Sequence, residues 1–409
     1  MWTRRAFLKG GALAVLSCGW GGLPSFLART ASAEPIGKTK TLVCLFQRGA
    51  MDGLMACQPI GNESLSKLRP QLLLPAQGDT GLLTLDGRFG LHPGLQPLHQ
   101  HFTEGQLAIV HGIGSPNTTR SHFDAQDYME TGIVDRKGAA SGWLNRATGL
   151  LGHESTPFQS VAMTESTPKS LYGERPTLSI SSLDDFKLKA SSKETEDSLE
   201  KLYQSATQQA LQRRGSEAFE AADILSAKRY QAYKPAHEAN YPNSPLGRSL
   251  RQIAFLIKSG VGLEIAFAES NGWDTHRGQG KHQGAFARRA RDLSESIHAF
   301  WTDLGSYQDR VVLMTMTEFG RTVAQNGSGG TDHGRGSCMF VLGGEVNGGK
   351  IYGEVGPLST DSLEDGRDLP VTTDFRRLFA GVAGQHLKIP AGQQLFPRWS
   401  GKPMSVLRG

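Results

Sequence analysis

TLVCLFQRGAMDG, at residues 41–53, joins a continuous apolar run to a polar loop that contains glycine. An apolar run that ends in such a loop is typical of a strand buried on both faces of a parallel sheet. The predicted strands of this kind are Thr41–Phe46, Leu107–Val110, Ser160–Met163, Leu263–Ala268, Val311–Met316 and Met339–Leu342. Several are followed by a loop and an amphipathic helix. This order predicts the α/β class, as a three-layer α/β/α sandwich with a mostly parallel sheet.

Two regions between the predicted strands have a helical character. Ser244 and Pro245 provide a cap and a first-turn proline for a helix that continues through Leu250–Ile257. Residues 185–240 are charged, rich in Glu, Lys and Gln, and poor in β-branched residues. They are predicted to form one or two surface helices, as a cap or insertion in a single domain that spans residues 34–409.

The start of the chain has the features of an export signal. TRRAFLK at residues 3–9 pairs two arginines with an apolar step, and a short apolar run follows at residues 10–18. Ala31-Ser32-Ala33 supplies the small residues that signal peptidase needs. We predict that residues 1–33 are a twin-arginine signal peptide read by the twin-arginine translocase. The mature protein would then begin near Glu34, in the periplasm or outside the cell. The alternative is a lipoprotein form processed at Cys18.

The predicted signal also accounts for most of the positive charge of the chain. Residues 1–33 contain four of the 44 basic residues and none of the 39 acidic ones, which leaves a formal charge of about +1. Nucleic-acid binding is therefore not expected. No later segment is long and apolar enough to predict a stable membrane span. The cysteines that remain have no regular spacing and allow at most one disulfide; they are Cys44, Cys57 and Cys338.

Polar groups that suit a metal ion follow the predicted strands. In an open parallel sheet, ligands bind outside the carboxyl ends of the strands. The groups expected at that edge are Asp52, Ser121, Asp274, His276, Glu318, Asp332 and His333. Each alone has a structural explanation; Ser121, for example, resembles a helix cap because Asp124 follows three residues later. Together, carboxylates and imidazoles at one edge predict bound Zn²⁺ or Mn²⁺.

Five stretches of the chain resemble a known family. FQRGAMDG (46–53), TTRSHFDAQDYMETG (118–132), GWDTH (272–276), TEFGRT (317–322) and TDHGRGSCMFVLGGEVNGG (331–349) are similar to domain-of-unknown-function family 1501. That family looks like a branch of the alkaline phosphatase superfamily, which also contains sulfatases. The resemblance implies an alkaline-phosphatase-like sandwich, one or two divalent metal ions, and an anionic ester as substrate.

The resemblance also implies roles for individual residues. Asp52 resembles the carboxylate ligand that follows the first strand. Ser121 resembles the nucleophile at a helix start, where the helix N-terminus favours an anionic group. Asp274 and His276 look like the Asp and His of one metal site. Candidates to clamp the anionic group of the substrate through bidentate contacts are Arg48, Arg120 and Arg321.

The Asp332-His333 pair allows two assignments. In the preferred one, His333 completes the site of Asp274 and His276. Asp332 then orients a neighbouring imidazole or loop amide, and Glu318 is a metal ligand of a second site. In the other assignment, Asp332 and His333 both bind the ion of that second site, and Glu318 turns away.

The sequence is compatible with two functions. The first is a metal-dependent hydrolase or transferase that acts on phosphate or sulfate esters, with Ser121 as nucleophile. The second is a degenerate, non-catalytic member that serves as a periplasmic binding or assembly factor for a secreted polymer or partner protein. Phe319 stands where the superfamily has a histidine and favours the second function; the retained Asp, His and Ser residues favour the first. A formylglycine sulfatase is not expected, because CQPIG at residues 57–61 lacks the arginine of that motif.

Overall fold

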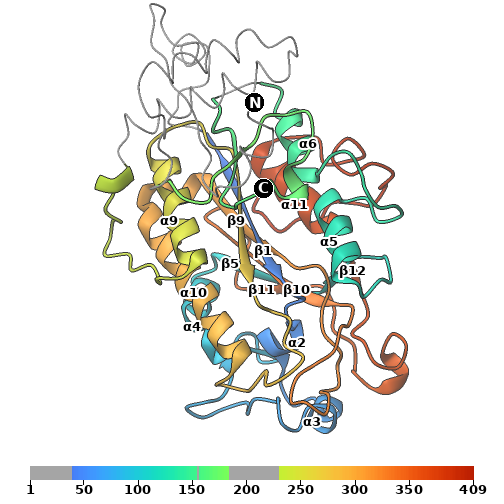
Figure 1. The fold of residues 1–409 in the computed structure, drawn as a ribbon. Coiled ribbons are helices and arrows are strands. Elements are labelled where there is room, and N and C mark those ends of the chain that lie inside the picture. Colours follow the sequence, from blue (N-terminus) through green and yellow to red (C-terminus); the bar gives the residue numbers. More distant parts are fainter. Residues whose placement is uncertain (1–38, 154–155, 184–229) are drawn as a thin grey trace, which may run out of the picture.

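A nine-stranded sheet forms the centre of the computed structural model, which describes residues 39–153, 156–183 and 230–409 (Figure 1). The strand order is β11-β5-β10-β9-β1-β8-β6-β7, and β12 pairs with β5. The strands are β1 (Thr41–Arg48), β5 (Leu107–Gly114), β6 (Ser160–Ala162), β7 (Leu178–Ser179), β8 (Ile265–Asn271), β9 (Val311–Met316), β10 (Ser337–Gly343), β11 (Lys350–Tyr352) and β12 (Thr373–Asp374). All six predicted strands are present, and the α/β class is confirmed.

The direction of one strand decides where the chain's polar loops meet. β1 pairs in parallel with β8 and β9, whereas β10 runs antiparallel to both β5 and β9. The other pairings in this sheet are parallel, so the prediction of a mostly parallel sheet is confirmed. The carboxyl ends of β1, β5, β8 and β9 therefore share an edge with the beginning of β10.

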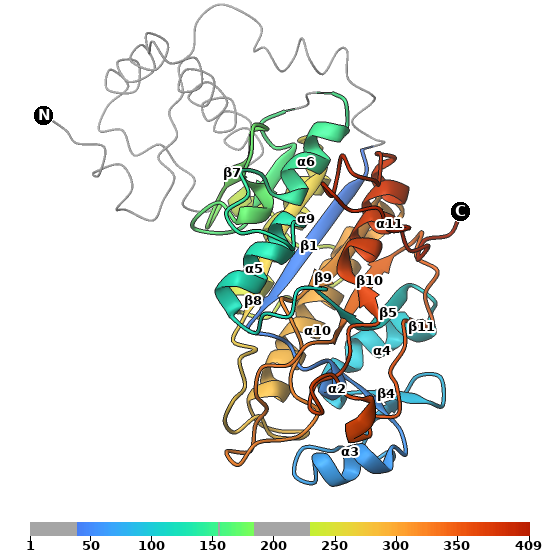
Figure 2. The same ribbon diagram turned by 90° about the vertical axis from the view of Figure 1, so that its right-hand side faces the viewer.

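Helices cover both faces of the sheet. In β1, Val43 and Leu45 belong to one apolar core cluster, while Cys44 and Phe46 belong to another on the opposite face. Helices α4, α9 and α10 cover the first face and α5, α6 and α11 the second, as Figures 1 and 2 show from two directions. Their bounds are α4 (Gln96–Thr103), α5 (His122–Thr131), α6 (Trp143–Leu150), α9 (Pro245–Lys258), α10 (Ala285–Leu304) and α11 (Phe375–Leu387). The three-layer sandwich is confirmed.

The predicted start of α9 is also confirmed. Ser244 accepts a hydrogen bond from the backbone N–H of Gly247 at 3.0 Å, and Pro245 occupies the first turn. The apolar face of the helix, which includes Leu250 and Ile253, is buried against the sheet.

Shorter elements complete the fold. They are α2 (Gly53–Ala56), α3 (Glu63–Leu68), and a second sheet of β2 (Cys57–Pro59), β3 (Leu83–Thr84) and β4 (Phe89–Leu91). Of these, α2 and α3 lie at the bottom of the view in Figure 1.

Two predicted segments lie wholly or mostly outside the described residues. These are the signal peptide at residues 1–33 and the helical insertion at residues 185–240, of which only residues 230–240 are described. Within the described ranges, none of the helices combines the length and apolarity that a membrane crossing requires. Cys44, Cys57 and Cys338 are buried free thiols, so no disulfide joins them.

Candidate metal centre

Four loops meet at the sheet edge where β10 begins. The loop after β5 leads to His122, the first residue of α5, and the loop after β8 carries Asp274 and His276. Glu318 follows β9 by two residues, and His333 precedes β10 by four. The reversed direction of β10 brings His333, which precedes a strand, to the edge where the other loops follow theirs.

Imidazole nitrogens and one carboxylate oxygen converge at this edge. His122, Asp274 and His333 each offer a ligand atom, and these atoms lie within 4.8 Å of one another. Nε2 of His333 lies 3.0 Å from Nε2 of His122 and 2.9 Å from Nε2 of His276. Oδ1 of Asp274 lies 3.1, 3.4 and 3.6 Å from the Nε2 atoms of His276, His333 and His122 respectively. We call these four residues the imidazole cluster.

The outward nitrogen of each ring is held by an oxygen. The contacts run from Nδ1 of His122 to Oε1 of Glu318 at 2.8 Å, from Nδ1 of His276 to Oδ1 of Asp332 at 2.9 Å, and from Nδ1 of His333 to the carbonyl oxygen of Arg120 at 2.9 Å. Carboxylate and carbonyl oxygens only accept hydrogen bonds, so each Nδ1 carries the hydrogen. Each ring, when neutral, then turns an Nε2 lone pair toward the same point.

This arrangement fits a bound divalent cation. Lone pairs that point at one another repel, and a cation placed between them replaces the repulsion with attraction. Metal-bound histidines characteristically donate their other N–H to a carboxylate or a backbone carbonyl, which fixes the tautomer and the ring orientation. Imidazole nitrogen and carboxylate oxygen are ligands that Zn²⁺ accepts in proteins. The imidazole cluster could therefore hold a metal ion.

Glu318 is the most enclosed of the groups behind the cluster. Its Oε1 accepts hydrogen bonds from Nδ1 of His122, from Nε2 of Gln126 at 2.9 Å and from the backbone N–H of Gly49 at 2.9 Å. Burial would raise the pKa of Glu318, but these hydrogen bonds lower it below its ordinary value. Gly49 can lie here, next to the loop that carries Asp274, because it has no side chain. At its φ of +111°, a Cβ atom would lie 2.5 Å from the backbone nitrogen of Asp274.

The charges around the cluster shift the pKa values of His122 and His333 in opposite directions. Burial would lower the pKa of His122, but its hydrogen bond to Glu318 and the neighbouring carboxylates raise it above the usual range. Burial and the charge of His122 lower the pKa of His333. Phe319 packs on both rings, with centroid separations of 4.9 Å to His122 and 5.1 Å to His333. The residue that replaces an expected histidine thus forms an apolar wall beside the cluster.

The structure brings together Asp274, His276 and His333, which the preferred assignment placed in one site, and it places Asp332 against His276. Glu318 differs from the predicted arrangement, because its carboxylate faces His122 and not the converging Nε2 atoms. Sequence reasoning missed His122. The available signal is its position directly after Ser121, at the start of the helix that follows β5.

Asp52 lies apart from the imidazole cluster, in a buried ion pair. It caps α2, and Nη1 of Arg69 lies 3.0 and 2.8 Å from its two carboxylate oxygens. Nε2 of Gln279 donates to Oδ2 of Asp52 at 2.7 Å. The side chains of Asp52 and Arg69 are 1 and 2 % exposed, so the carboxylate is already neutralised. Asp52, predicted as a ligand of a second metal site, therefore lies outside the converging ligand atoms.

Ser121 and the three candidate arginines also have specific surroundings. Ser121 is the N-cap residue of α5, but its side chain makes no capping hydrogen bond and is exposed, contrary to the cap interpretation. All three guanidinium groups are paired with carboxylates of the chain: Arg48 with Glu130 and Glu269, Arg120 with Asp365 and Asp368, and Arg321 with Asp274. A substrate anion would have to displace these partners, so the arginines are not poised as the predicted clamp.

Comparison with known proteins identifies the family. A family model described as "Protein of unknown function (DUF1501)" matches residues 82–395. The chain belongs to the DUF1501 family. The predicted resemblance is confirmed, and the matched region of this DUF1501 protein contains all four residues of the imidazole cluster together with Glu318. No curated protein matches the chain at a significant level.

Similar solved structures include three bacterial enzymes. The PsFucS1 sulfatase from Pseudoalteromonas sp. is 10 % identical with a TM-score of 0.38, and the match covers 92 % of this chain and 75 % of the sulfatase chain. The lipoteichoic acid synthase LtaP from Listeria monocytogenes is 8 % identical with a TM-score of 0.30, covering 78 and 67 %. The alkaline phosphatase from the Antarctic bacterium TAB5 is 12 % identical with a TM-score of 0.29, covering 77 and 95 %. Similarities this weak carry no inference about the chemistry of the DUF1501 protein.

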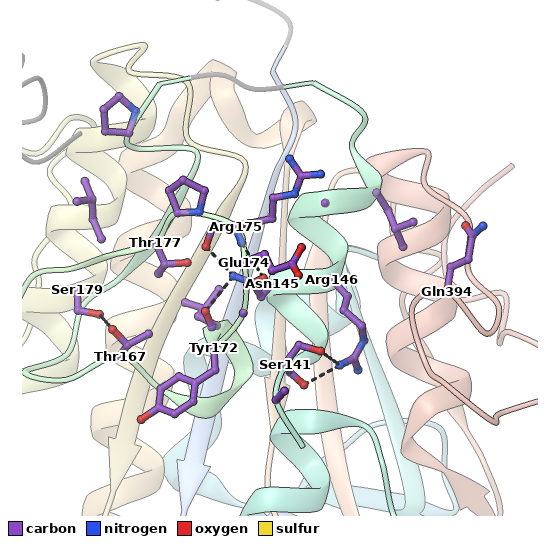
Figure 3. Close-up of a pocket in the computed structure, with 18 residues that line it drawn as sticks. Ser141, Asn145, Arg146, Thr167, Tyr172, Glu174, Arg175, Thr177, Ser179 and Gln394 are labelled. Atoms are coloured by element: carbon purple, nitrogen blue, oxygen red, sulfur yellow. Dashed lines mark hydrogen bonds between the residues drawn. The ribbon is translucent and has the colours of Figure 1, made fainter. Parts of the chain in front are cut away.

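A cavity of about 910 Å³ lies between α6 and residues 172–179. Figure 3 shows Tyr172 and Asn145 among its lining residues, with Arg146 bonded to Ser141. None of the residues of the imidazole cluster contributes to it. Although its volume is large, this cavity is therefore separate from the candidate metal site.

Replacing Glu318 with Gln is expected to lower metal affinity roughly 10- to 100-fold, because the charge behind His122 is lost. Asp332→Asn should have a smaller effect. The side chain of Asp332 is 54 % exposed, so solvent screens its charge, whereas that of Glu318 is 0 % exposed. Competition with a chelator of known affinity measures both changes. A larger loss in Asp332→Asn than in Glu318→Gln would contradict the arrangement.

Proposed function

We propose that this DUF1501 protein is an exported metal-dependent hydrolase or transferase that acts on phosphate or sulfate esters. The observation that carries the proposal is the convergence of three imidazole Nε2 atoms and the Asp274 carboxylate, with each outward Nδ1 held by an oxygen. His122, Asp274 and His333, whose ligand atoms lie within 4.8 Å of one another, would hold one Zn²⁺ or Mn²⁺ ion, with His276, which lies beside His333 and Asp274, as a further ligand. A bound ion of this kind polarises an ester oxygen and favours an ionised nucleophile.

The chain's own residues divide the remaining work. Glu318 and Asp332 hold the rings of His122 and His276 in the orientation that points Nε2 inward. Phe319 excludes water from one side of the rings. Ser121 has an exposed hydroxyl at the start of α5, where the free N–H groups of the helix favour an anionic group. We assign Ser121 as the nucleophile.

The surroundings of the carboxylates favour one metal ion over two. A second site would draw on Asp52 and Glu318. Asp52 is paired with Arg69, and the Oε1 atom of Glu318 already accepts three hydrogen bonds. Binding a second ion there would first break an ion pair in which both side chains are at most 2 % exposed, which is costly; Asp274 also pairs with an arginine, Arg321, but its side chain is 44 % exposed.

Metal analysis and ester turnover test the proposal together. Protein purified from the periplasm should contain about one equivalent of Zn²⁺ or Mn²⁺ per chain and hydrolyse 4-nitrophenyl phosphate or 4-nitrophenyl sulfate. Ser121→Ala should lower kcat by at least about 100-fold while metal content stays unchanged, since a nucleophile and not a ligand is lost. Absence of bound metal in the unmutated protein would refute the metal centre.

The N-terminus of the same preparation tests export and cleavage. It is expected at or next to Glu34.

The second candidate function is a non-catalytic binding or assembly factor for a secreted polymer or partner protein. The pairing of Arg48, Arg120 and Arg321 with internal carboxylates favours it, because none of these guanidinium groups is free for a substrate anion. A protein that binds one equivalent of metal but turns over neither ester would support this candidate over the enzyme.

A further inference from the structure

An exposed aromatic residue is the sequence neighbour of His122, one member of the imidazole cluster. Phe123 follows His122 in α5, and 88 % of it is exposed. Among the described residues, Tyr172, at 47 %, is the other large apolar side chain with high exposure. A phenyl ring exposed to water lacks the favourable free energy that burial would give it. An exposed ring beside a candidate metal ligand is therefore typical of a binding surface.

Phe123 forms part of the wall of a polar cavity. The cavity has a volume of about 730 Å³, within the usual range for small-molecule sites. Uncharged hydrogen-bonding side chains contribute much of its lining: Gln126, Thr164, Ser166, Ser249, Gln252 and Asn271. The amides of Gln126 and Gln252 are already bonded within the chain. The cavity therefore offers a ligand an aromatic ring on one face and neutral groups such as Ser166, Ser249 and Asn271 on the others.

Most charges in the lining are paired within the chain, and three basic against four acidic residues leave a net charge of −1, which disfavours an anion. Arg48 pairs with Glu130 and Glu269 at 3.1 and 2.7 Å, and Lys169 pairs with Asp127 at 2.6 Å. The other two charged lining residues, Glu165 and Arg248, are exposed and of opposite sign. The cavity consequently favours an uncharged ligand over an ionic one.

One side chain, Gln126, connects the cavity to the residue that supports the imidazole cluster. Gln126 lines the cavity, and its Nε2 donates to the Oε1 atom of Glu318 that also accepts from His122. Asn271, another lining residue, ends β8 three residues before Asp274. A molecule that rests against Phe123 would therefore lie one side chain away from Glu318, which holds His122 of the cluster.

We propose that this cavity binds a sugar ring stacked on Phe123, so that the substrate is a phosphate or sulfate ester of a carbohydrate. A pyranose has an apolar face of C–H groups, which suits an aromatic ring, and a rim of hydroxyl groups, which suits neutral amides and hydroxyls. This inference rests on the proposed function for the ester group, whereas the sugar site itself depends only on the cavity and Phe123.

Direct binding tests the inference without requiring catalysis. The full chain is screened on an array of neutral, phosphorylated and sulfated oligosaccharides, and the best neutral one is titrated by calorimetry. Phe123→Ala should weaken that binding by roughly 10-fold, and Phe123→Trp should retain it, because only the alanine variant lacks a stacking face. Tyr172→Ala, which removes an exposed ring from the other cavity, serves as the control and should bind normally. Thermal melting confirms that each variant is folded.

The outcomes separate this inference from the proposed function. Carbohydrate binding that depends on Phe123, in a protein that turns over no ester, would support the sugar site and refute the enzyme. Turnover of 4-nitrophenyl esters without binding to any array carbohydrate would refute the sugar site alone. Equal affinities of the unmutated protein and Phe123→Ala would also overturn the inference.

Discussion

His122→Ala is expected to abolish metal binding as completely as His333→Ala. Each substitution removes an Nε2 atom from the convergent group, and the remaining ligands leave the ion with an incomplete set. The loss should exceed the roughly 10- to 100-fold that follows removal of an outer hydrogen-bond partner. Metal content after dialysis, followed by chelator competition, measures the effect.

The control for this experiment is His282→Ala, which removes an exposed imidazole that is not part of the cluster. It should leave metal content unchanged. Retention of a full equivalent of metal by His122→Ala would remove this histidine from the ligand set. The ligands would then be Asp274, His276 and His333 alone, as the sequence predicted.

Arg69→Met is expected to destabilise the protein by about 3–5 kcal/mol, the usual cost of breaking a buried ion pair by removing one partner. The pair is 2.8 Å long, and the two side chains are 2 and 1 % exposed, so the substitution leaves the Asp52 carboxylate charged in a dry interior. Two further donations from Arg69, to the backbone carbonyls of Thr322 and Val323, are lost as well. The free energy of unfolding from denaturant titration measures the change.

Arg88→Met is the matched control, since Arg88 pairs with Asp86 at 2.9 Å but is 73 % exposed. Its expected effect is below about 1 kcal/mol. Equal destabilisation by the two substitutions would contradict the structural role given to the buried pair. Asp52→Asn should retain metal; loss of an equivalent of metal in that variant would restore Asp52 as a ligand.

Some features of the protein could be predicted without a structure because they depend on local pattern. A strand buried on both faces must be apolar throughout, which is why Thr41–Phe46 and Val311–Met316 were recognised. A cap followed by a first-turn proline similarly located α9. Asp274 and His276 lie in one loop, two residues apart, and the family resemblance implied that they share a metal site.

The role of each carboxylate depended on partners distant in the sequence. Glu318 turns to His122, 196 residues away, and is held there by Gly49 and Gln126. Asp52 is held by Arg69 and by Gln279, 227 residues away. A carboxylate binds whichever cation or donor the folded chain brings nearest, so its sequence neighbours could not show which would be a ligand and which a support.

The sequence by itself determined the layers of the fold and the edge at which polar groups collect, because periodic apolar patterns follow from burial alone. Only the tertiary structure decided that His122 joins Asp274, His276 and His333, and that Asp52 and Glu318 do not. β10 runs against its neighbours, and this reversal places His333 opposite His122 across the sheet edge. Strand direction is set by packing and pairing over the whole sheet, and neither leaves a mark in the residues of a single strand.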